Sequence, residues 1–247
     1  MVSFGHFGKK IALRGELMND DAKKRAAEIA LEFIEDGQIL GLGTGSTTKF
    51  AIEGIGRMVQ QGLKVRGIPT SKASAQLASE LGIPLLDLND VSRINITIDG
   101  SDECDPEFNL IKGGGGALTR EKLVALASEK RVIIVDDSKL VEQLGLTRLL
   151  PVEVLPFAWR LSARYLKRLG GEPQLRMSVE QPFVTDNGNY ILDCSFGGIA
   201  EPAEMERAIK LVPGVVENGL FIGIADTLVI SFPDRVDVRH RPTQHSP

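Results

Sequence analysis

Histidine is scarce in this sequence, and it occurs only near the ends of the chain. His6, His240 and His245 are the only three among 247 residues. Imidazole is the usual general acid or base near neutral pH, so proton transfer inside the folded core must rely on carboxylates or lysines. Zinc and most other transition-metal sites depend on His or clustered Cys, which the sequence does not offer. We therefore expect no metal site of that kind.

Cysteine and long apolar runs are scarce as well. Cys104 and Cys194 are too few for a disulfide framework, which fits a reducing compartment. No apolar run approaches the about 20 residues of a membrane span, and the segment Met1–Leu17 lacks the continuous apolar stretch of a secretory signal. The sequence predicts a cytoplasmic protein with no membrane partner.

The sequence also lacks an excess of charge of one sign. The 29 basic and 33 acidic residues are interspersed and give a net charge of -4. Binding to a nucleic-acid backbone needs a basic stripe, so we expect no nucleic-acid partner. With 43% apolar residues, the chain can bury a sizeable core in one large domain or two modest ones.

Apolar strands and amphipathic helices alternate through residues 19–148. The first helical pattern begins at Asn19 or Asp20 and ends near Gly37. Three apolar strands are then predicted, and a polar motif follows the carboxyl end of each. The strands are Gln38–Gly43, Ile94–Gly100 and Arg131–Asp136. A parallel sheet with helices on its faces opens its binding crevice at that end. The sequence thus predicts an α/β protein in which residues 19–148 form a Rossmann-like doubly wound domain.

The pattern changes after residue 148. Strand and helix signals over residues 149–223 follow the order β-α-β-β-α-β of a ferredoxin-like α+β domain, with two half-strands flanking an Asn187-Gly188 turn. A further strand, Asp226–Phe232, exceeds that unit, so we expect residues 224–233 to rejoin the first sheet. Residues 1–18 are predicted to be an N-terminal extension, and the polar residues 234–247 a disordered tail.

The segment Thr44-Gly-Ser-Thr-Thr48 joins a predicted strand to a predicted helix. Hydroxyl groups and free backbone N–H groups at a helix N-terminus form an anion site, which the helix dipole strengthens. A dinucleotide fingerprint would need a third glycine where Ser46 stands, and a Walker loop would need Gly-Lys before Ser or Thr. The alternative is a plain helix cap, which explains Thr44 or Ser46 alone but not the whole run. We expect a phosphate-binding turn.

A stretch of carboxylates, lysines and glycines occupies the next strand-to-helix connection. Asp99 and Asp102 stand at the strand end, Lys112 precedes four glycines, and Glu121 lies in the first turn of the next helix. Such a set can move protons. Simpler alternatives are a flexible glycine loop, a calcium loop, or a helix-start carboxylate worth about 0.3–1 kcal/mol. The calcium alternative fits poorly, because the aspartates fall at every third position instead of alternating.

Several segments together resemble ribose-5-phosphate isomerase type A in order and spacing. They are Gly43–Thr47, Asp99–Glu103, Ile111–Gly115, Thr119–Lys122 and Asp137–Lys139. The resemblance runs from about residue 20 to residue 233 and includes residues 151–154 and 184–189 of the smaller predicted domain. Its departures are the N-terminal extension, the polar tail and Ser101, where alanine is common in the family.

The resemblance implies an aldose–ketose isomerase that needs no metal or cofactor. Its implied reaction interconverts D-ribose 5-phosphate and D-ribulose 5-phosphate through an enediolate, in the non-oxidative pentose phosphate pathway. Glu121 would carry the proton between C2 and C1. Asp99, Asp102 and Lys112 would assist ring opening, proton transfer between the sugar oxygens and charge stabilisation. The implied substrate-binding residues are Lys23, Thr44, Gly45, Ser46, Thr47, Gly100, Ser101, Gly113, Gly114, Gly115 and Lys139. The resemblance also implies a homodimer or homotetramer.

A sugar-phosphate sensor without catalytic activity is the alternative on a similar fold. Such a sensor needs the phosphate turn but not the acid–base set. We expect an enzyme, because the complete acid–base set stands beside the turn and no helix-turn-helix segment precedes the domain.

Overall fold

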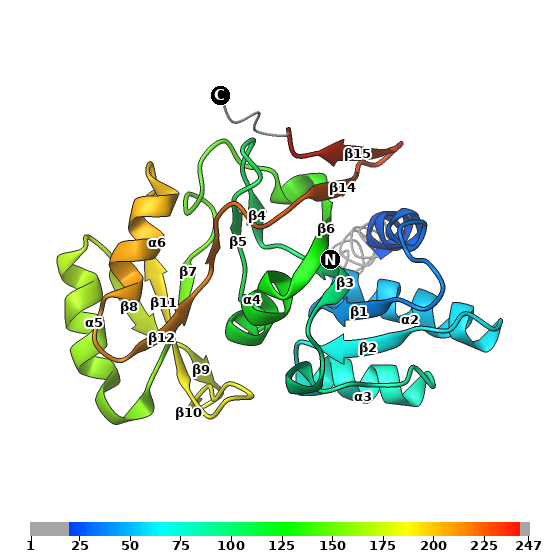
Figure 1. Cartoon of the computed structure of the whole chain (residues 1–247). Helices are drawn as coiled ribbons and strands as arrows, with labels where there is room; N and C mark the ends of the chain where they lie inside the picture. The colour runs from blue at the N-terminus through cyan, green and yellow to red at the C-terminus, as the bar shows by residue number, and fades with distance from the viewer. Residues whose placement is uncertain (1–19, 243–247) are drawn as a thin grey trace, which may run out of the picture.

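The larger part of the molecule is built on a six-stranded sheet. The computed structural model describes residues 20–242, and the sheet has the order β15-β14-β6-β3-β1-β2 (Figure 1). Its strands are β1 (Ile39–Leu42), β2 (Arg66–Pro69), β3 (Ile94–Gly100), β6 (Ser128–Asp136), β14 (Thr227–Ser231) and β15 (Val236–His240). Neighbouring strands are parallel except for β14 and β15. The predicted parallel α/β sheet is confirmed, including the return of β14, whereas residues 1–18 lie outside the described residues.

Helices cover both faces of this sheet. They are the helix over residues 20–31, α2 (Ser46–Gln60), α3 (Lys72–Glu80) and α4 (Leu118–Leu126). Alternation along β6 explains the two layers, since successive side chains of a strand point to opposite faces. Val132 and Ile134 pack with the helix over 20–31 and α2, whereas Ile133 and Val135 pack with α4. The continuous apolar run of β6 is therefore buried on both sides.

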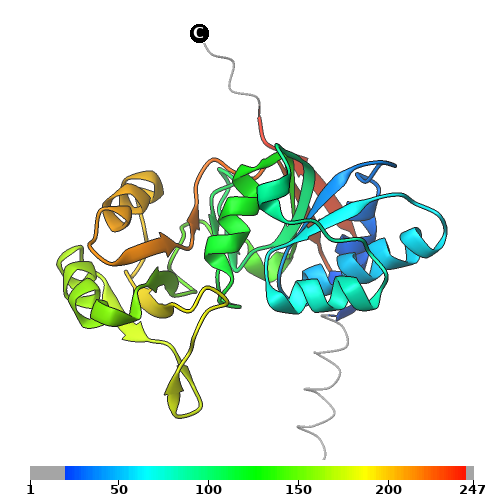
Figure 2. The same ribbon diagram turned by 60° about the horizontal axis from the view of Figure 1, so that its bottom comes forward.

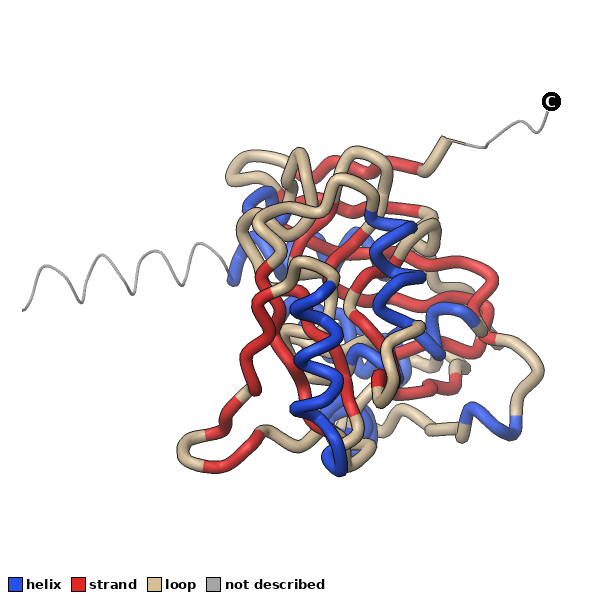
Figure 3. The backbone as a smooth tube through the Cα atoms, turned by 90° about the vertical axis from the view of Figure 1, so that its left-hand side faces the viewer, coloured by secondary structure: helices blue, strands red, loops and turns tan. Residues whose placement is uncertain are grey.

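The smaller part has the predicted ferredoxin-like topology. Its strands β7 (Leu150–Val154), β8 (Glu172–Leu175), β11 (Tyr190–Ser195) and β12 (Val215–Asn218) form a sheet in the order β12-β7-β11-β8, with all neighbours antiparallel. Two helices, α5 (Trp159–Arg168) and α6 (Pro202–Lys210), lie over one face of it (Figure 3). Side chains from both helices share one core with alternate residues of β7 and β11. The opposite face of β7 and β11 carries Glu153 and Asp193 together with the buried Ile191.

A three-stranded sheet joins the two parts of the chain. Its strands are β4 (Glu103–Cys104), β5 (Leu110–Ile111) and β13 (Leu220–Phe221), and β5 lies between the others. Gly219 precedes β13, and a Cβ on it would lie 2.2 Å from the carbonyl oxygen of Lys112. The N–H of Lys112 also donates to the carbonyl of Gly219 at 2.9 Å, so the two backbone segments are in direct contact. Strands β4 and β5 come from the larger part of the chain, and β13 comes from the end of the smaller part. This sheet therefore crosses the predicted boundary between the two domains. The domain boundaries at 148/149 and 223/224 remain our proposal.

The predicted disordered tail over residues 234–247 is wrong for residues 236–240. These residues form β15, which pairs with β14 after a turn closed by a 2.8 Å hydrogen bond from the N–H of Phe232 to the carbonyl of Arg235. The strand is an edge strand, and charged residues such as Asp237 and Arg239 are typical of edges. The polar composition of this edge strand resembles that of a disordered tail, which explains the wrong prediction. Residues 243–247 lie outside the described residues.

The predicted half-strand before Asn187 is also wrong. The chain instead forms a small hairpin, β9 (Met177–Ser178) and β10 (Gln181–Pro182), which extends away from the smaller sheet (Figure 2). The polar groups of Thr185, Asn187 and Asn189 then converge on the buried carboxylate of Glu153, with Thr185 Oγ1 donating to it at 2.9 Å. Their side chains hold the turn closed, and residues 183–186 belong to no strand.

Candidate active site

A cavity of about 170 Å³ opens where β1, β3 and β6 end. Drug-sized ligands occupy sites of about 300–1,000 Å³, so this cavity fits a smaller molecule. Every predicted site residue except Asp99 lines it. The lining consists of Lys23, Thr44, Gly45, Ser46, Thr47, Thr48, Gly100, Ser101, Asp102, Lys112, Gly113, Gly114, Gly115, Glu121, Asp136 and Lys139.

The turn between β1 and α2 presents an uncapped helix N-terminus to the cavity. Gly45 precedes α2 with a φ of 124°, a backbone conformation that favours glycine, and no side chain of the described residues caps the helix. The hydroxyl of Thr44 is engaged elsewhere, 2.7 Å from Thr70 Oγ1 and 2.9 Å from Ser71 Oγ. The plain helix-cap alternative is therefore wrong. The first N–H groups of α2 are arranged to bind an anion.

Two lysines add positive charge at this end of the cavity. Lys23 comes from the helix over residues 20–31, and its ammonium group lies 3.2 Å from Asp20. Lys139 comes from the short helix Asp137–Lys139 that follows β6. The first turn of α2 contains no acidic residue, so its dipole and both lysines act in the same direction. The structure thus brings together the residues predicted to hold a phosphate.

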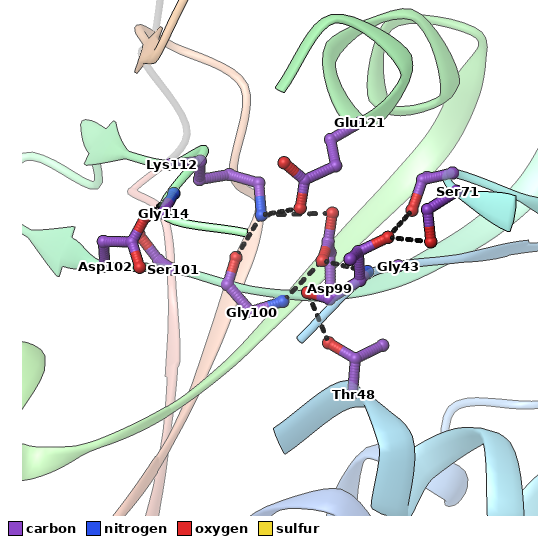
Figure 4. A network of polar contacts seen from close by, with 12 residues as sticks. Gly43, Thr48, Ser71, Asp99, Gly100, Ser101, Asp102, Lys112, Gly114 and Glu121 are labelled. Carbon is purple, nitrogen blue, oxygen red and sulfur yellow. Dashed lines mark hydrogen bonds and ion pairs between the residues drawn. The ribbon is translucent and has the colours of Figure 1, made fainter. Parts of the chain in front are cut away.

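Asp99 connects the phosphate turn to the lysine of the site (Figure 4). One of its carboxylate oxygens accepts from the N–H groups of Thr44 at 3.1 Å and Gly100 at 2.8 Å, and the other lies 3.1 Å from Lys112 Nζ. Gly43 provides the space, because a Cβ there would lie 2.2 Å from Asp99 Oδ1. Asp99 is 2% exposed, and its two carboxylate oxygens are already engaged by Thr44, Gly100 and Lys112.

Lys112 is the centre of the buried polar network in Figure 4. Its ammonium group donates to the carbonyl of Gly100 and to Glu121 Oε1 at 3.0 Å, and it pairs with Asp99. Burial alone would lower the pKa of Lys112, but the negative charges of Asp99 and Glu121 outweigh burial and raise that pKa. The lysine is therefore a cation that lines the cavity, with the carboxyl groups of Asp99 and Glu121 around it.

Glu121 points into the site from the first turn of α4. It is 4% exposed and contacts Lys112 (Figure 4). Burial raises the pKa of Glu121 to about 8, although the positive charge of Lys112 opposes this rise. A solvated helix-start charge would have neither property, so the dipole alternative does not explain this residue. A carboxyl group that titrates near neutral pH is suited to accept and return a proton.

The glycine run forms a fixed part of the cavity wall. The N–H of Gly114 donates to Asp102 Oδ2 at 2.7 Å, and the N–H of Gly116 donates to the carbonyl of Gly113 at 2.9 Å. Gly113 has a φ of 104°, and a Cβ on Gly114 would lie 2.8 Å from Asp102 Oδ1. The backbone can approach the carboxylate only because side chains are absent. These contacts contradict the flexible-loop alternative.

Two residues that line the cavity were not predicted from the sequence. Thr48 lies in the first turn of α2, and Asp136 ends β6, where its carboxylate accepts from the N–H of Ser138 at 3.1 Å. The signal for Asp136 was present, since it stands at the carboxyl end of a predicted parallel strand. Ser101 lines the cavity as predicted, but its hydroxyl donates to the carbonyl groups of Glu103 and Ile111.

The calcium-loop alternative is not supported by the geometry. Asp99 and Asp102 each bind separate partners, and Asp105 accepts from the N–H groups of Glu107 and Asn109. Within residues 20–242, no group of three or more His, Cys, Asp and Glu side chains is arranged to hold a metal ion. Nor does any helix in that range have the length and apolar character needed to cross a membrane.

The chain is similar to a set of named isomerases. A family model described as ribose 5-phosphate isomerase A (phosphoriboisomerase A) matches residues 66–235. A ribose-5-phosphate isomerase A of Gloeobacter violaceus is 53% identical over 220 residues, which cover 89% of this chain and 96% of that relative. One of Thermosynechococcus vestitus is 50% identical and covers 86% of this chain and 94% of its own length.

Solved structures agree with these sequence relatives. Ribose 5-phosphate isomerase A of Methanocaldococcus jannaschii superposes with a TM-score of 0.86 at 40% identity, covering 90% of this chain and 99% of that one. A D-ribose-5-phosphate isomerase in complex with phospho-erythronic acid gives a TM-score of 0.87 at 40% identity, covering 90% of this chain and 98% of that one. The match extends over nearly the full length of each protein. The chain belongs to the ribose 5-phosphate isomerase A family.

Proposed function

We propose that this protein interconverts D-ribose 5-phosphate and D-ribulose 5-phosphate through an enediolate, the aldose–ketose step of the non-oxidative pentose phosphate pathway. The observation that carries the proposal is the joint placement of an anion-binding turn and a buried acid–base set in one small cavity. Membership of the family indicates the substrate. The cavity offers one region for the phosphate of that substrate and another for its reacting carbons.

The phosphate group would bind at the N-terminus of α2. Its negative charge would be balanced by the first N–H groups of that helix, by the hydroxyl groups of Ser46 and Thr47, and by Lys23 and Lys139. A lysine suits this task as a compact point charge. The sugar carbons would then extend toward Lys112 and Glu121 at the other end of the cavity.

Substitutions at the phosphate end are expected to act mainly on KM. Thr47→Val and Lys139→Ala should each raise KM for ribose 5-phosphate, because the phosphate stays remote from the carbons that react. A smaller loss of kcat is expected, since remote binding energy also orients the reacting end. Steady-state kinetics of both variants would measure the split. If KM were unchanged in both, the phosphate would have to bind elsewhere.

Glu121 would carry the proton between C2 and C1. A base must lie within hydrogen-bonding reach of the proton that it removes, and the Glu121 carboxylate lines the cavity beside Lys112. When the proton leaves C2, negative charge develops on the oxygens of the enediolate, and the Lys112 ammonium group would stabilise it. Asp102, in the cavity wall, would assist ring opening and proton exchange between the sugar oxygens.

Asp99 would act through Lys112 instead of on the sugar. Its carboxylate oxygens are occupied by backbone N–H groups and by the lysine, and it does not line the cavity. It would therefore hold the ammonium group in place and keep it charged. This assignment refines the sequence prediction, which placed Asp99 among the groups that move protons.

The similar structure with phospho-erythronic acid is consistent with this arrangement. Phospho-erythronic acid carries a phosphate at one end and a planar carboxylate at the other, so it presents two adjacent oxygens with shared negative charge, as an enediolate does. A site that binds both ends must combine an anion turn with a cation at the reacting end. Compounds that share features of a transition state bind more tightly than substrates.

A direct assay tests the proposed function. Purified protein should convert ribose 5-phosphate into a ketose, detected by its absorbance or by nuclear magnetic resonance. Exchange of the substrate's C2 proton in heavy water should accompany turnover. Binding of ribose 5-phosphate without ketose formation would contradict the proposal and favour a sugar-phosphate sensor.

We propose that the reaction needs no metal or cofactor. Charge stabilisation would come from Lys112 and from backbone N–H groups, which serve this purpose in other enzymes. Exhaustive EDTA treatment, followed by dialysis and metal analysis, is therefore expected to leave kcat and KM unchanged. Loss of activity that one divalent ion restores would contradict this prediction.

We also propose that the protein is cytoplasmic and forms a homodimer or homotetramer. Free cysteines support a reducing compartment, since Cys104 and Cys194 are both buried and unbridged. Exposed apolar side chains such as Phe157, Val179 and Leu211 support contacts between copies. Sedimentation or light scattering of the purified protein would give the number of subunits.

A further inference from the structure

Arg176 reaches from the smaller part of the molecule to the glycine run of the active site. It follows β8, and its side chain is 15% exposed. On one side, Nε donates to Asp193 Oδ2 at 2.8 Å and a second nitrogen donates to Asp193 Oδ1. On the other side, one terminal nitrogen donates to the carbonyl groups of Gly113 and Gly114, both at 3.0 Å. The guanidinium group therefore links β11 to the cavity wall.

These contacts fix the orientation of two peptide groups. In a trans peptide, the carbonyl and the following N–H point in opposite directions. Because Arg176 holds the carbonyl of Gly113, the N–H of Gly114 points away from it, onto Asp102 Oδ2 at 2.7 Å. Because Arg176 also holds the carbonyl of Gly114, the N–H of Gly115 must point away from the guanidinium group as well.

The N–H of Gly115 is available to a ligand. Gly115 lines the cavity, and a Cβ on it would lie 3.8 Å from Thr44 Cγ2 across the site. Among residues 20–242, no hydrogen-bond acceptor is assigned to this N–H. A free backbone N–H in the wall of a small cavity beside Lys112 is a suitable donor for negative charge that develops on a sugar oxygen.

Packing restricts Arg176 and the glycine run to this arrangement. The guanidinium group lies 5.7 Å from the ring centre of Phe183, and Gly116 lies directly against that ring. A Cβ on Gly116 would be 2.5 Å from Phe183 Cε1. Asp193 balances the charge of Arg176, so the arginine can lie beside the active site without adding a free cation to it.

We propose that Arg176, anchored by Asp193, is a positioning residue that orients the peptide groups of Gly113–Gly115 for the isomerisation. The inference rests on the proposed function. In this role Arg176 does not touch the substrate. It directs one N–H onto Asp102 and a second toward the oxygens at the reacting end of the sugar.

The test is the variant Arg176→Met, which keeps the apolar stem and removes all five donors. We expect kcat to fall by about 10- to 100-fold, because small misplacements at a reacting centre cost about that much. KM for ribose 5-phosphate should change by less than about threefold, since the phosphate binds at α2. Inhibition by phospho-erythronic acid should weaken by about the same factor as kcat, whereas inhibition by inorganic phosphate should not change.

Arg131→Met is the matched control. Arg131 also binds a carboxylate, Asp226, and donates to two carbonyl groups, those of Ser128 and Ile224, but it does not line the cavity. Its variant should show a comparable shift in melting temperature with parental kcat. If Arg176→Met had parental kcat and parental phospho-erythronic acid inhibition, the proposal would be overturned.

A milder variant covers the case in which Arg176→Met does not fold. Arg176→Lys keeps the charge but cannot bind Asp193 in a bidentate manner and reach both carbonyl groups at once. It should show an intermediate loss of kcat with unchanged KM, and parental kcat would again overturn the proposal. A parent protein that does not isomerise ribose 5-phosphate would instead refute the proposed function, because that measurement does not involve Arg176.

Discussion

Glu121→Gln is expected to lower kcat by about 10²–10⁴, which is the usual contribution of a positioned general base. Glutamine keeps the shape of the side chain and can still accept from Lys112, but it has no basic oxygen. Exchange of the C2 proton in heavy water should fall in parallel with turnover, because both require removal of the same proton. A variant that exchanges and isomerises at the parental rate would show that another residue is the base, with Asp102 the next candidate.

The same substitution should change how stability depends on pH. Burial raises the pKa of Glu121 from its ordinary 4.5 to about 8, so between these values the folded state retains a proton that the unfolded state has lost. The parent therefore loses stability as pH rises through this window. Glu121→Gln removes this contribution, and its melting temperature should decline less than that of the parent between pH 5 and about pH 9.

Glu103→Gln provides the control for a buried carboxylate outside the cavity. Glu103 is fully buried and accepts hydrogen bonds from the backbone N–H groups of Gly145, Thr147 and Arg148. A glutamine cannot accept all of them, so one or more buried donors would lose a partner, at about 1–3 kcal/mol each. We expect this variant to melt earlier and to retain parental kcat, the reverse of Glu121→Gln.

The parts of the site that follow strands were predictable from the sequence. Parallel strands align their carboxyl ends, so the order of strand and polar motif was enough to group the Thr44 turn, Asp102 and Lys139 around one opening. The glycine run was recognisable because no helix or strand favours four glycines. The resemblance to the isomerase family then assigned roles that the residues alone left open, such as the one for Glu121.

The parts that depend on contacts between distant segments were not predictable. β4, β5 and β13 are two residues each, too short to give a periodic signal, yet they bring Gly219 against Lys112. Glu153 and Arg176 look like ordinary strand and loop residues, and only the folded chain shows that they reach Thr119 and the glycine run. Asp99 was assigned to the right network, but the sequence could not show that it lies behind Lys112.

The substitution Lys112→Met is expected to have a large effect on both stability and kcat. Lys112→Met removes the cation that lies between Asp99 and Glu121, both of which are almost fully buried. Breaking a buried ion pair by removing one partner costs about 3–5 kcal/mol, because the remaining charge loses its compensation. We expect a loss of stability of that size at pH 7, and a fall in kcat of about 10²–10³ from the lost stabilisation of the enediolate.

Lys122→Met separates the two effects. Lys122 is a buried neighbour that pairs with Glu217 at 2.8 Å and lies over the same Phe221 ring as Lys112, at 5.1 Å compared with 5.5 Å, but it does not line the cavity. Its loss should lower stability and leave kcat near the parental value. If both lysine variants lost activity equally, the effect of Lys112 would be structural rather than chemical.

The double variant Lys112→Met, Glu121→Gln tests which carboxyl group carries the uncompensated charge. Burial raises the pKa of Glu121 to about 8, and loss of the lysine raises that pKa further, so Glu121 is mostly neutral at pH 7. Urea unfolding at pH 7 should therefore show about the same deficit as Lys112→Met alone, with Asp99 as the remaining buried charge. The deficit of the single variant should shrink as pH falls and the carboxyl groups take up protons, since neutral acids need no counter-charge. Activity should stay lost under every one of these conditions. Recovery of stability without recovery of turnover would show that Asp99, Lys112 and Glu121 are held together at a cost to the fold, and that this cost serves the chemistry of the site.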